Sequence, residues 1–225
     1  MKNKLIGNLR LIVILEISAI LLLIIVGLIG YYYQIPFEDL TANPLSQINI
    51  PFYQGILQRV GLILWGFVVI LPLFTCYILE SSKIPGETKR FLLFSGIFFG
   101  YFLIDELLLI HNFIFPKVLN IHQLLVVIVY AVLTLIFLIR FRIIIKNNFL
   151  WLFVIAISFL GLSVLVDILS YLKVIRFSFR YLLDDGAKFL GIFNLFVYYF
   201  FYCKDLILDY KNHYKIKNQV LDRQF

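Results

Sequence analysis

Six long apolar stretches separated by short polar segments dominate the chain. Hydropathy predicts helices near residues 11–33, 57–80, 91–115, 122–143, 149–172 and 181–203. Most of these stretches reach the roughly 20 residues that cross about 30 Å of hydrocarbon. The connections carry Pro, Gly or Asn, which end helices and let the backbone meet water. The pattern predicts an all-α fold, a polytopic membrane helical bundle of about six transmembrane helices.

The same pattern predicts how the chain is divided. We expect one six-helix transmembrane domain over residues 1–203 and a short basic cytoplasmic tail over residues 204–225. The early part of this tail either continues the sixth helix along the cytoplasmic surface or forms a solvated helix end.

Composition excludes a water-soluble fold. The chain is 62% hydrophobic and 15% charged, whereas about a quarter of the residues in soluble domains are charged. The net charge of +7 does not indicate nucleic acid, because Lys and Arg fall in short clusters between apolar runs. The expected partner is the lipid bilayer.

The basic residues predict the orientation. With both termini on the cytoplasmic side, fourteen of the twenty Lys and Arg residues are cytoplasmic, as the positive-inside rule requires. The loop with Lys173, Arg176 and Arg180 departs from the rule, so it either lies against anionic headgroups or marks wrongly drawn spans. We expect a bacterial cytoplasmic (inner) membrane protein.

Ionisable side chains occur inside the predicted spans, where each costs at least about 2.5 kcal/mol at mid-depth. They cluster late in the third and fifth spans and early in the second, fourth and sixth, and all of these positions share the outer half of the membrane. The main ones are Asp105, Glu106, His111 and Asn112, then His122 and Asp167, then Asp184, Asp185 and Lys188. Their common depth predicts a polar, acid-rich pocket near the extracytoplasmic side.

A straight third helix cannot bring all its polar groups together. Asp105 and Asn112 fall on one stripe, while Glu106 is about 100° round the helix and His111 about 120° the other way. Either neighbouring helices supply partners, or the last turn before Pro116 unwinds. In the sixth helix, Lys188 can pair with Asp184 or Asp185 at i+4 or i+3 spacing.

Two segments resemble an uncharacterised family of small bacterial multi-pass membrane proteins. These segments are Asp105-Glu106-Leu107-Leu108-Leu109-Ile110-His111-Asn112 and Asp184-Asp185-Gly186-Ala187-Lys188-Phe189-Leu190-Gly191. The family patterns are similar to D-E-x-x-x-x-H-E and E-E-x-x-E-x-x-G. Asn112 stands where the family has Glu, and Lys188 where it has a third acid. The resemblance implies that Gly191 is a packing glycine, and it implies no settled activity.

The residues favour a site that binds a polar headgroup or small ligand, with other functions left open. The expected ligand-binding residues are Asp105, Glu106, His111, Asn112, Asp184, Asp185 and Lys188. The first alternative is a metal-dependent hydrolase of a lipid-like ester or amide. Its catalytic candidates are Asp105, Glu106 and His111, and its candidate ligands of a divalent metal are Asp105, Glu106, His111, His122, Asp184 and Asp185. Lys188 counts against a metal, because its ammonium already supplies cationic charge.

Two further alternatives use the same residues. They could relay protons or a cation in a coupled transporter, although Glu16 is the only acid in the inner half that could extend a path. They could also fix helix register in a structural membrane assembly protein. Whether the protein is an enzyme stays open at this point.

Two smaller motifs concern packing. Gly96 and Gly100, four residues apart, permit close helix contact, either inside the bundle or between copies in a homo-oligomer. Ser163 and Asp167 share a helical face and favour interhelical hydrogen bonding over catalysis.

Overall fold

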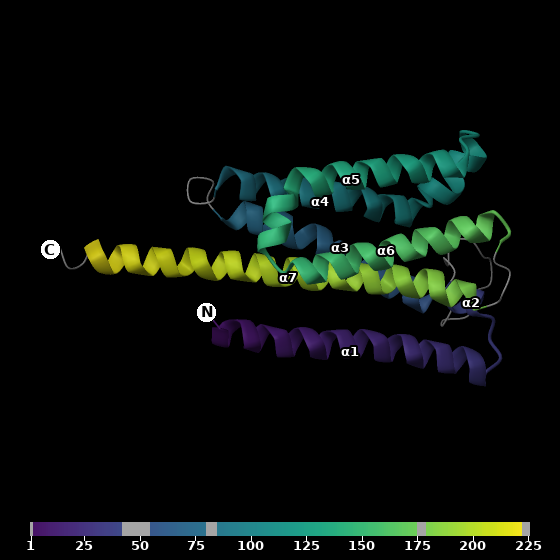
Figure 1. Ribbon diagram of the computed structural model, residues 1–225, viewed down its shortest axis with the longest axis horizontal. Coiled ribbons are helices and arrows are strands. Elements are labelled where there is room, and N and C mark those ends of the chain that lie inside the picture. Colours follow the sequence, from purple (N-terminus) through teal and green to yellow (C-terminus); the bar gives the residue numbers. More distant parts are fainter. Residues whose placement is uncertain (1, 42–54, 80–84, 175–178, 222–225) are drawn as a thin grey trace. The chain divides into compact units, whose positions relative to one another are not determined.

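The computed structural model describes residues 2–41, 55–79, 85–174 and 179–221, and these ranges contain helices and no strands. The helices are α1 (Lys2–Tyr32), α2 (Phe37–Thr41), α3 (Ile56–Ile78), α4 (Gly86–Leu108), the π-helix η2 (Ile110–Val118), α5 (Gln123–Asn147), α6 (Leu150–Tyr171) and α7 (Arg180–Leu221) (Figure 1). The predicted all-α fold is therefore confirmed.

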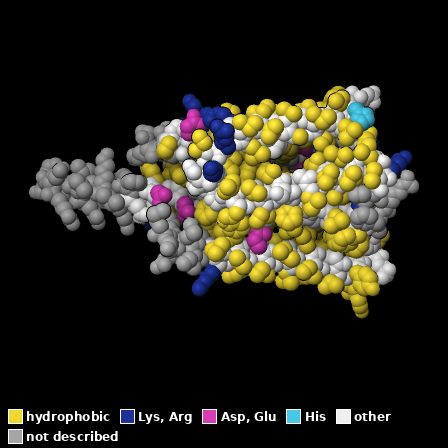
Figure 2. Space-filling view, in the orientation of Figure 1, with side chains coloured by type: hydrophobic (Ala, Val, Ile, Leu, Met, Phe, Trp, Pro, Cys, Tyr) yellow, Lys and Arg dark blue, Asp and Glu magenta, His cyan; other side chains and the backbone are white. Residues whose placement is uncertain are grey.

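Six of these helices are long and apolar enough to cross a membrane, each at the position of a predicted span. Their flanks expose large apolar side chains that water would not solvate well, such as Ile63 and Ile70 of α3 and Ile128, Ile136 and Ile139 of α5. Figure 2 shows hydrophobic side chains over most of the visible face. The protein is an integral membrane protein, a polytopic helical bundle.

The structure divides the chain into two compact units. Unit 1 comprises Met1–Leu64 and Trp151–Val197, and unit 2 comprises Trp65–Leu150 and Tyr198–Phe225. The helices α3 and α7 each contribute residues to both units. The predicted division into a transmembrane domain over 1–203 and a tail over 204–225 stays a prediction.

Several helix boundaries differ from those expected. The first helix, predicted from residue 11, begins at Lys2. The third span, predicted as one helix over 91–115, ends as an α-helix at Leu108 and continues as η2 after Leu109. The sixth helix, predicted to end near 203, continues to Leu221. Because no Pro or Gly occurs in this extension, nothing in the local sequence breaks the helix there. The fifth and sixth candidate spans lie on either side of the basic loop, as predicted. Arg176 of this loop lies outside the described residues.

Aromatic side chains form the core of unit 2. The ring of Phe91 on α4, which is fully buried, contacts the rings of Phe137 and Phe141 of α5 and of Tyr199 and Tyr202 of α7. The Tyr199 hydroxyl donates a hydrogen bond of 2.9 Å to Ser95 Oγ. A buried tyrosine needs such a partner for its polar end.

Small residues allow two close helix contacts. A Cβ atom at Gly96 of α4 would lie 2.3 Å from Cγ of Leu73 in α3, and one at Gly191 of α7 would lie 2.6 Å from Cγ of Leu160 in α6. Gly96 therefore makes a contact inside the chain, within unit 2, and Gly191 is the packing glycine that the resemblance implied. A homo-oligomer through the face of Gly96 and Gly100 stays a prediction.

Candidate functional site

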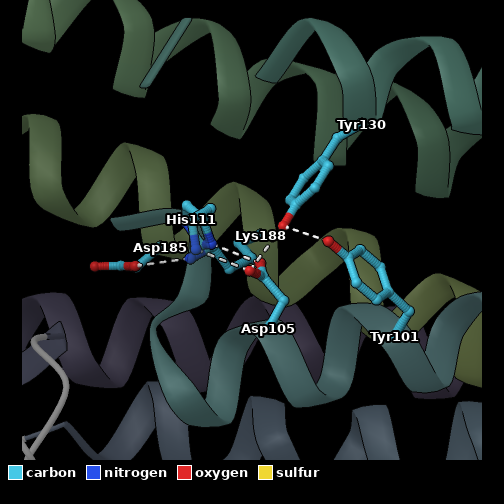
Figure 3. Close-up of polar contacts among 6 residues, drawn as sticks. All are labelled: Tyr101, Asp105, His111, Tyr130, Asp185 and Lys188. Atoms are coloured by element: carbon cyan, nitrogen blue, oxygen red, sulfur yellow. Dashed lines mark hydrogen bonds and ion pairs between the residues drawn. The ribbon is translucent and has the colours of Figure 1, made fainter. Parts of the chain in front are cut away.

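The Asp105 carboxylate is the centre of a polar cluster in unit 2. Asp105 is buried, with 3% of its surface exposed. Oδ1 accepts a hydrogen bond of 2.9 Å from the backbone N–H of His111 and another of 2.9 Å from the Tyr130 hydroxyl. Oδ2 lies 2.5 Å from Nδ1 of His111, and the Tyr101 hydroxyl lies 3.0 Å from that of Tyr130 (Figure 3). We call these four residues the Asp105 cluster.

A break in the helix creates this geometry. Leu109 has φ 52°, a left-handed conformation that ends α4, and its N–H still donates to the Asp105 carbonyl. Two residues further on, the N–H of His111 donates to the Asp105 side chain. Pro116 has no N–H and cannot restore a regular α-helix, and the chain continues as the π-helix η2.

A comparison of free energies explains why the break in the helix is stable. A left-handed Leu costs roughly 1–2 kcal/mol. A hydrogen bond to a charged group contributes about 1.5–3 kcal/mol, and the Asp105 carboxylate has three donors. The bonds outweigh the backbone cost. The helix is broken at Leu109, earlier than the last turn before Pro116, which belongs to η2. A neighbouring helix, α5, also supplies a partner through Tyr130.

The cluster fixes the orientation of the His111 ring. A carboxylate only accepts hydrogen bonds. Nδ1 of His111 is therefore the protonated nitrogen, and it donates a hydrogen bond to Asp105 Oδ2. In the neutral ring, Nε2 then holds the lone pair and acts as an acceptor or base. The side chain of His111 is 18% exposed and that of Asp105 is 4% exposed. A buried carboxylate thus holds an imidazole that is itself partly exposed.

Two members of the cluster were not among the predicted site residues. Tyr101 lies four residues before Asp105, on the same face of α4, and this spacing was a usable signal. Tyr130 belongs to α5, and no local pattern in the sequence links it to Asp105. Its hydroxyl bridges Tyr101 and Asp105, and its ring packs edge-on against those of Tyr101 and Phe102.

Asp184 and Asp185, at the start of α7, belong to unit 1. Asp184 Oδ1 accepts a hydrogen bond of 2.5 Å from the Ser163 hydroxyl of α6, which confirms interhelical hydrogen bonding by Ser163. Lys188 Nζ lies 3.9 Å from Asp185 Oδ1, the predicted i+3 pair (Figure 3). The prediction that these residues and Asp105 line a single pocket stays a prediction.

The other predicted residues are less well connected to this chemistry. Glu106, which follows Asp105 in the sequence, is buried. His122 caps α5, because its Nδ1 accepts from the N–H of Leu124 at 3.3 Å. The side chain of Asn112 lies outside the described residues.

The metal alternative stays a prediction. Within the ranges that the structure describes, no three His, Cys, Asp or Glu side chains form a group that could hold a metal ion. Of the candidate ligands Asp105, Glu106, His111, His122, Asp184 and Asp185, the structure places Asp105 and His111 at short distance. A protein metal site normally has at least three ligands from the protein.

Comparison with known proteins gives a family but no activity. No curated protein and no solved structure matches the chain. One family model, described as Domain of unknown function (DUF8692), matches residues 16–203, which include both clusters of ionisable residues and the greater part of each of the six spans. The chain belongs to this family of proteins whose domain has no assigned function.

Proposed function

We propose that this protein binds a polar lipid headgroup or a small polar ligand, and that His111 of the Asp105 cluster makes the contact. The observation that carries the proposal is the held imidazole: its Nδ1 is fixed by a buried carboxylate, and its side chain is partly exposed. The left-handed Leu109 and the π-helix next to it support this proposal, because such features concentrate at functional sites.

The depth of the cluster favours a headgroup. Asp105 lies three residues before the end of the candidate span Gly86–Leu108, and Tyr130 lies seven residues after the start of Gln123–Asn147. At 1.5 Å per residue these separations are about 5 Å and about 10 Å. Polar parts of lipids reach this depth, whereas the middle of the hydrocarbon offers no hydrogen-bonding ligand.

The proposal also includes the membrane in which the protein lies and its orientation there. The chain sits in a bacterial cytoplasmic membrane with both termini in the cytoplasm, and the Asp105 cluster faces the opposite side. The positive-inside rule supports this orientation. The motifs D-E-x-x-x-x-H and D-D-x-x-x-x-x-G, at Asp105 and Asp184, are then family features of the site.

The chemistry of Nε2 suggests a direct test. As an acceptor it prefers a headgroup with a hydrogen-bond donor, so a short-chain phosphatidylethanolamine should bind more tightly than the phosphatidylcholine with the same tails. Both lipids are zwitterionic, and only the first has N–H donors. We expect the ethanolamine lipid to raise the unfolding midpoint of the detergent-solubilised protein more, because a ligand at a hundred times its Kd stabilises by about 2.7 kcal/mol.

Matched variants complete this experiment. In His111→Asn the difference between the two lipids should vanish, whereas in His122→Asn, where Asn can still cap the helix, it should remain. If the wild-type protein responds equally to both lipids, or if His111→Asn still tells them apart, a headgroup contact through His111 is excluded.

Hydrolysis of a lipid-like ester is the second candidate. The pair of Asp105 and His111 has the arrangement of a carboxylate that orients a histidine base. In this reading Nε2 takes a proton from water or from a hydroxyl group. Release of fatty acid from a short-chain phospholipid, lost in His111→Asn and kept in His122→Asn, would support it, and an inactive wild type would leave binding alone.

A further inference from the structure

A second polar pair lies in unit 1, inside the membrane span of α1. Glu16 is the fifth residue of the candidate span Ile12–Tyr32, and its Oε2 accepts a hydrogen bond of 3.2 Å from the side-chain N–H of Asn194 in α7. The pairing of Glu16 with another helix is the role that its position in an apolar span favours.

The pair leaves two buried oxygens without donors. Asn194 is fully buried, and its Nδ2 donates both to Glu16 and to the carbonyl of Leu190 at 2.9 Å. Within the described part of the chain, its Oδ1 has no hydrogen-bond partner, and neither has Oε1 of Glu16, which is also buried. Buried polar atoms of this kind normally have a partner.

A charged Glu16 is poorly compensated at this place. Among the described residues Glu16 has no ion-pair partner, and the Asn194 amide, which does not titrate, is its only hydrogen-bond partner. Burying an unpaired carboxylate in an apolar medium costs so much free energy that the group normally binds a proton and becomes neutral. A bound proton supplies both the neutralisation and the donor that is missing.

We propose that Glu16 is a proton-binding site, at which the carboxyl group is held neutral at physiological pH as a cyclic acid–amide pair with Asn194. The proton sits on Oε1 and is donated to Asn194 Oδ1, while Oε2 continues to accept from Nδ2. The proton comes from water, and no other bond forms or breaks. Both unpartnered oxygens are then satisfied by one hydrogen atom.

The test uses the wild-type protein in lipid nanodiscs. Dicyclohexylcarbodiimide is soluble in lipid and reacts with carboxyl groups that hold a proton, to give a stable N-acylurea that mass spectrometry of peptides can locate. We expect modification of Glu16 at neutral pH at least about tenfold more often than of Glu38, since labelling follows the protonated fraction. Glu38 in α2 and Glu87, which is paired with Arg140, are exposed controls in the same digest.

Two outcomes overturn the proposal. Absence of modification at Glu16 at neutral pH, with labelling only in acid, means an ionised carboxylate. Modification that added sodium ions suppress, at constant ionic strength, means that the two oxygens hold a monovalent cation and not a proton.

Infrared spectra test the pairing separately. The C=O stretching band of a neutral carboxyl group, which shifts in heavy water, should disappear in Glu16→Gln and remain in Glu38→Gln. In Asn194→Leu the band should move to higher frequency, because the carboxyl loses its amide partner. A band that neither Glu16→Gln nor Asn194→Leu changes would show that Glu16 carries no proton in this pair.

Discussion

At the scale of single residues, hydrogen-bond donors stabilise the buried Asp105 carboxylate. Its three donors are a backbone N–H, an imidazole and a phenol, and none of them is a Lys or Arg. This arrangement gives the carboxylate oxygens hydrogen-bond partners at a depth where water is scarce, and it fixes His111 in one orientation. Hydrogen bonds, and not ion pairs with Lys or Arg, therefore stabilise the cluster.

Removing one donor should have a measurable cost. In Tyr130→Phe the ring remains and the hydroxyl that bridges Tyr101 and Asp105 is lost. We expect a loss of about 1.5–3 kcal/mol in the free energy of unfolding, the usual contribution of a hydrogen bond to a charged group. Thermal or denaturant unfolding in detergent measures it. Tyr77→Phe, at a side chain 88% exposed, is the control and should change stability by less than about 0.5 kcal/mol.

At the scale of elements, the end of α4 lies at a different residue from the one that hydropathy predicts. Apolar residues continue past Leu108, and hydropathy alone extends the third helix to residue 115. The side chain of Asp105 competes with the backbone carbonyls for the N–H of His111, and the helix ends. An apolar stretch thus determines that a span exists, while one polar side chain determines where its regular part stops.

The left-handed residue gives a prediction at this scale. In Leu109→Ile a β-branched side chain must adopt φ 52°, so we expect a destabilisation of about 1 kcal/mol or more. The same change one residue earlier, Leu108→Ile, falls on an exposed position with helical backbone and should be nearly neutral. Equal unfolding midpoints for the two variants would contradict a left-handed Leu109.

The contact between α6 and α7 gives another prediction. A Cβ atom in Gly191→Ala would lie 2.6 Å from Cγ and 3.0 Å from the backbone nitrogen of Leu160, so the helices must separate. We expect a loss of about 1–3 kcal/mol, as for other overpacked sites. Gly161→Ala, in α6 with nothing within 4 Å, should instead stabilise by about 0.5–1 kcal/mol, because Ala restricts the unfolded chain. Opposite shifts of the unfolding midpoint would confirm the contact.

At the scale of the whole molecule, six spans, an even number, predict that both termini lie on one side of the membrane. The positive-inside rule predicts that this side is the cytoplasm, since fourteen of the twenty basic residues would then lie inside. This assignment determines which leaflet supplies the headgroup that we propose for the Asp105 cluster.

Labelling of single cysteines in intact cells tests the orientation. In a background in which Cys76 and Cys203 are replaced by Ala, we expect a membrane-impermeant maleimide to react from outside with Glu38→Cys. Lys2→Cys and Lys215→Cys should react only after the membrane is opened. Labelling of either terminal variant in sealed cells would reverse or break the predicted topology, and the proposed side of the site would change with it.

The sequence by itself determined the class of the fold, the number and order of the spans and most of their boundaries, because the transfer of apolar residues into hydrocarbon depends on composition and length. It also identified Asp105 and His111, since charge inside a span is costly wherever the chain places it. Only the tertiary structure decided which polar groups meet. The link from Tyr130 to Asp105 and the link from Glu16 to Asn194 join different helices, and the turn at Leu109 follows from hydrogen bonds to a side chain. Such contacts depend on distances and angles between helices, which periodicity along the chain does not encode.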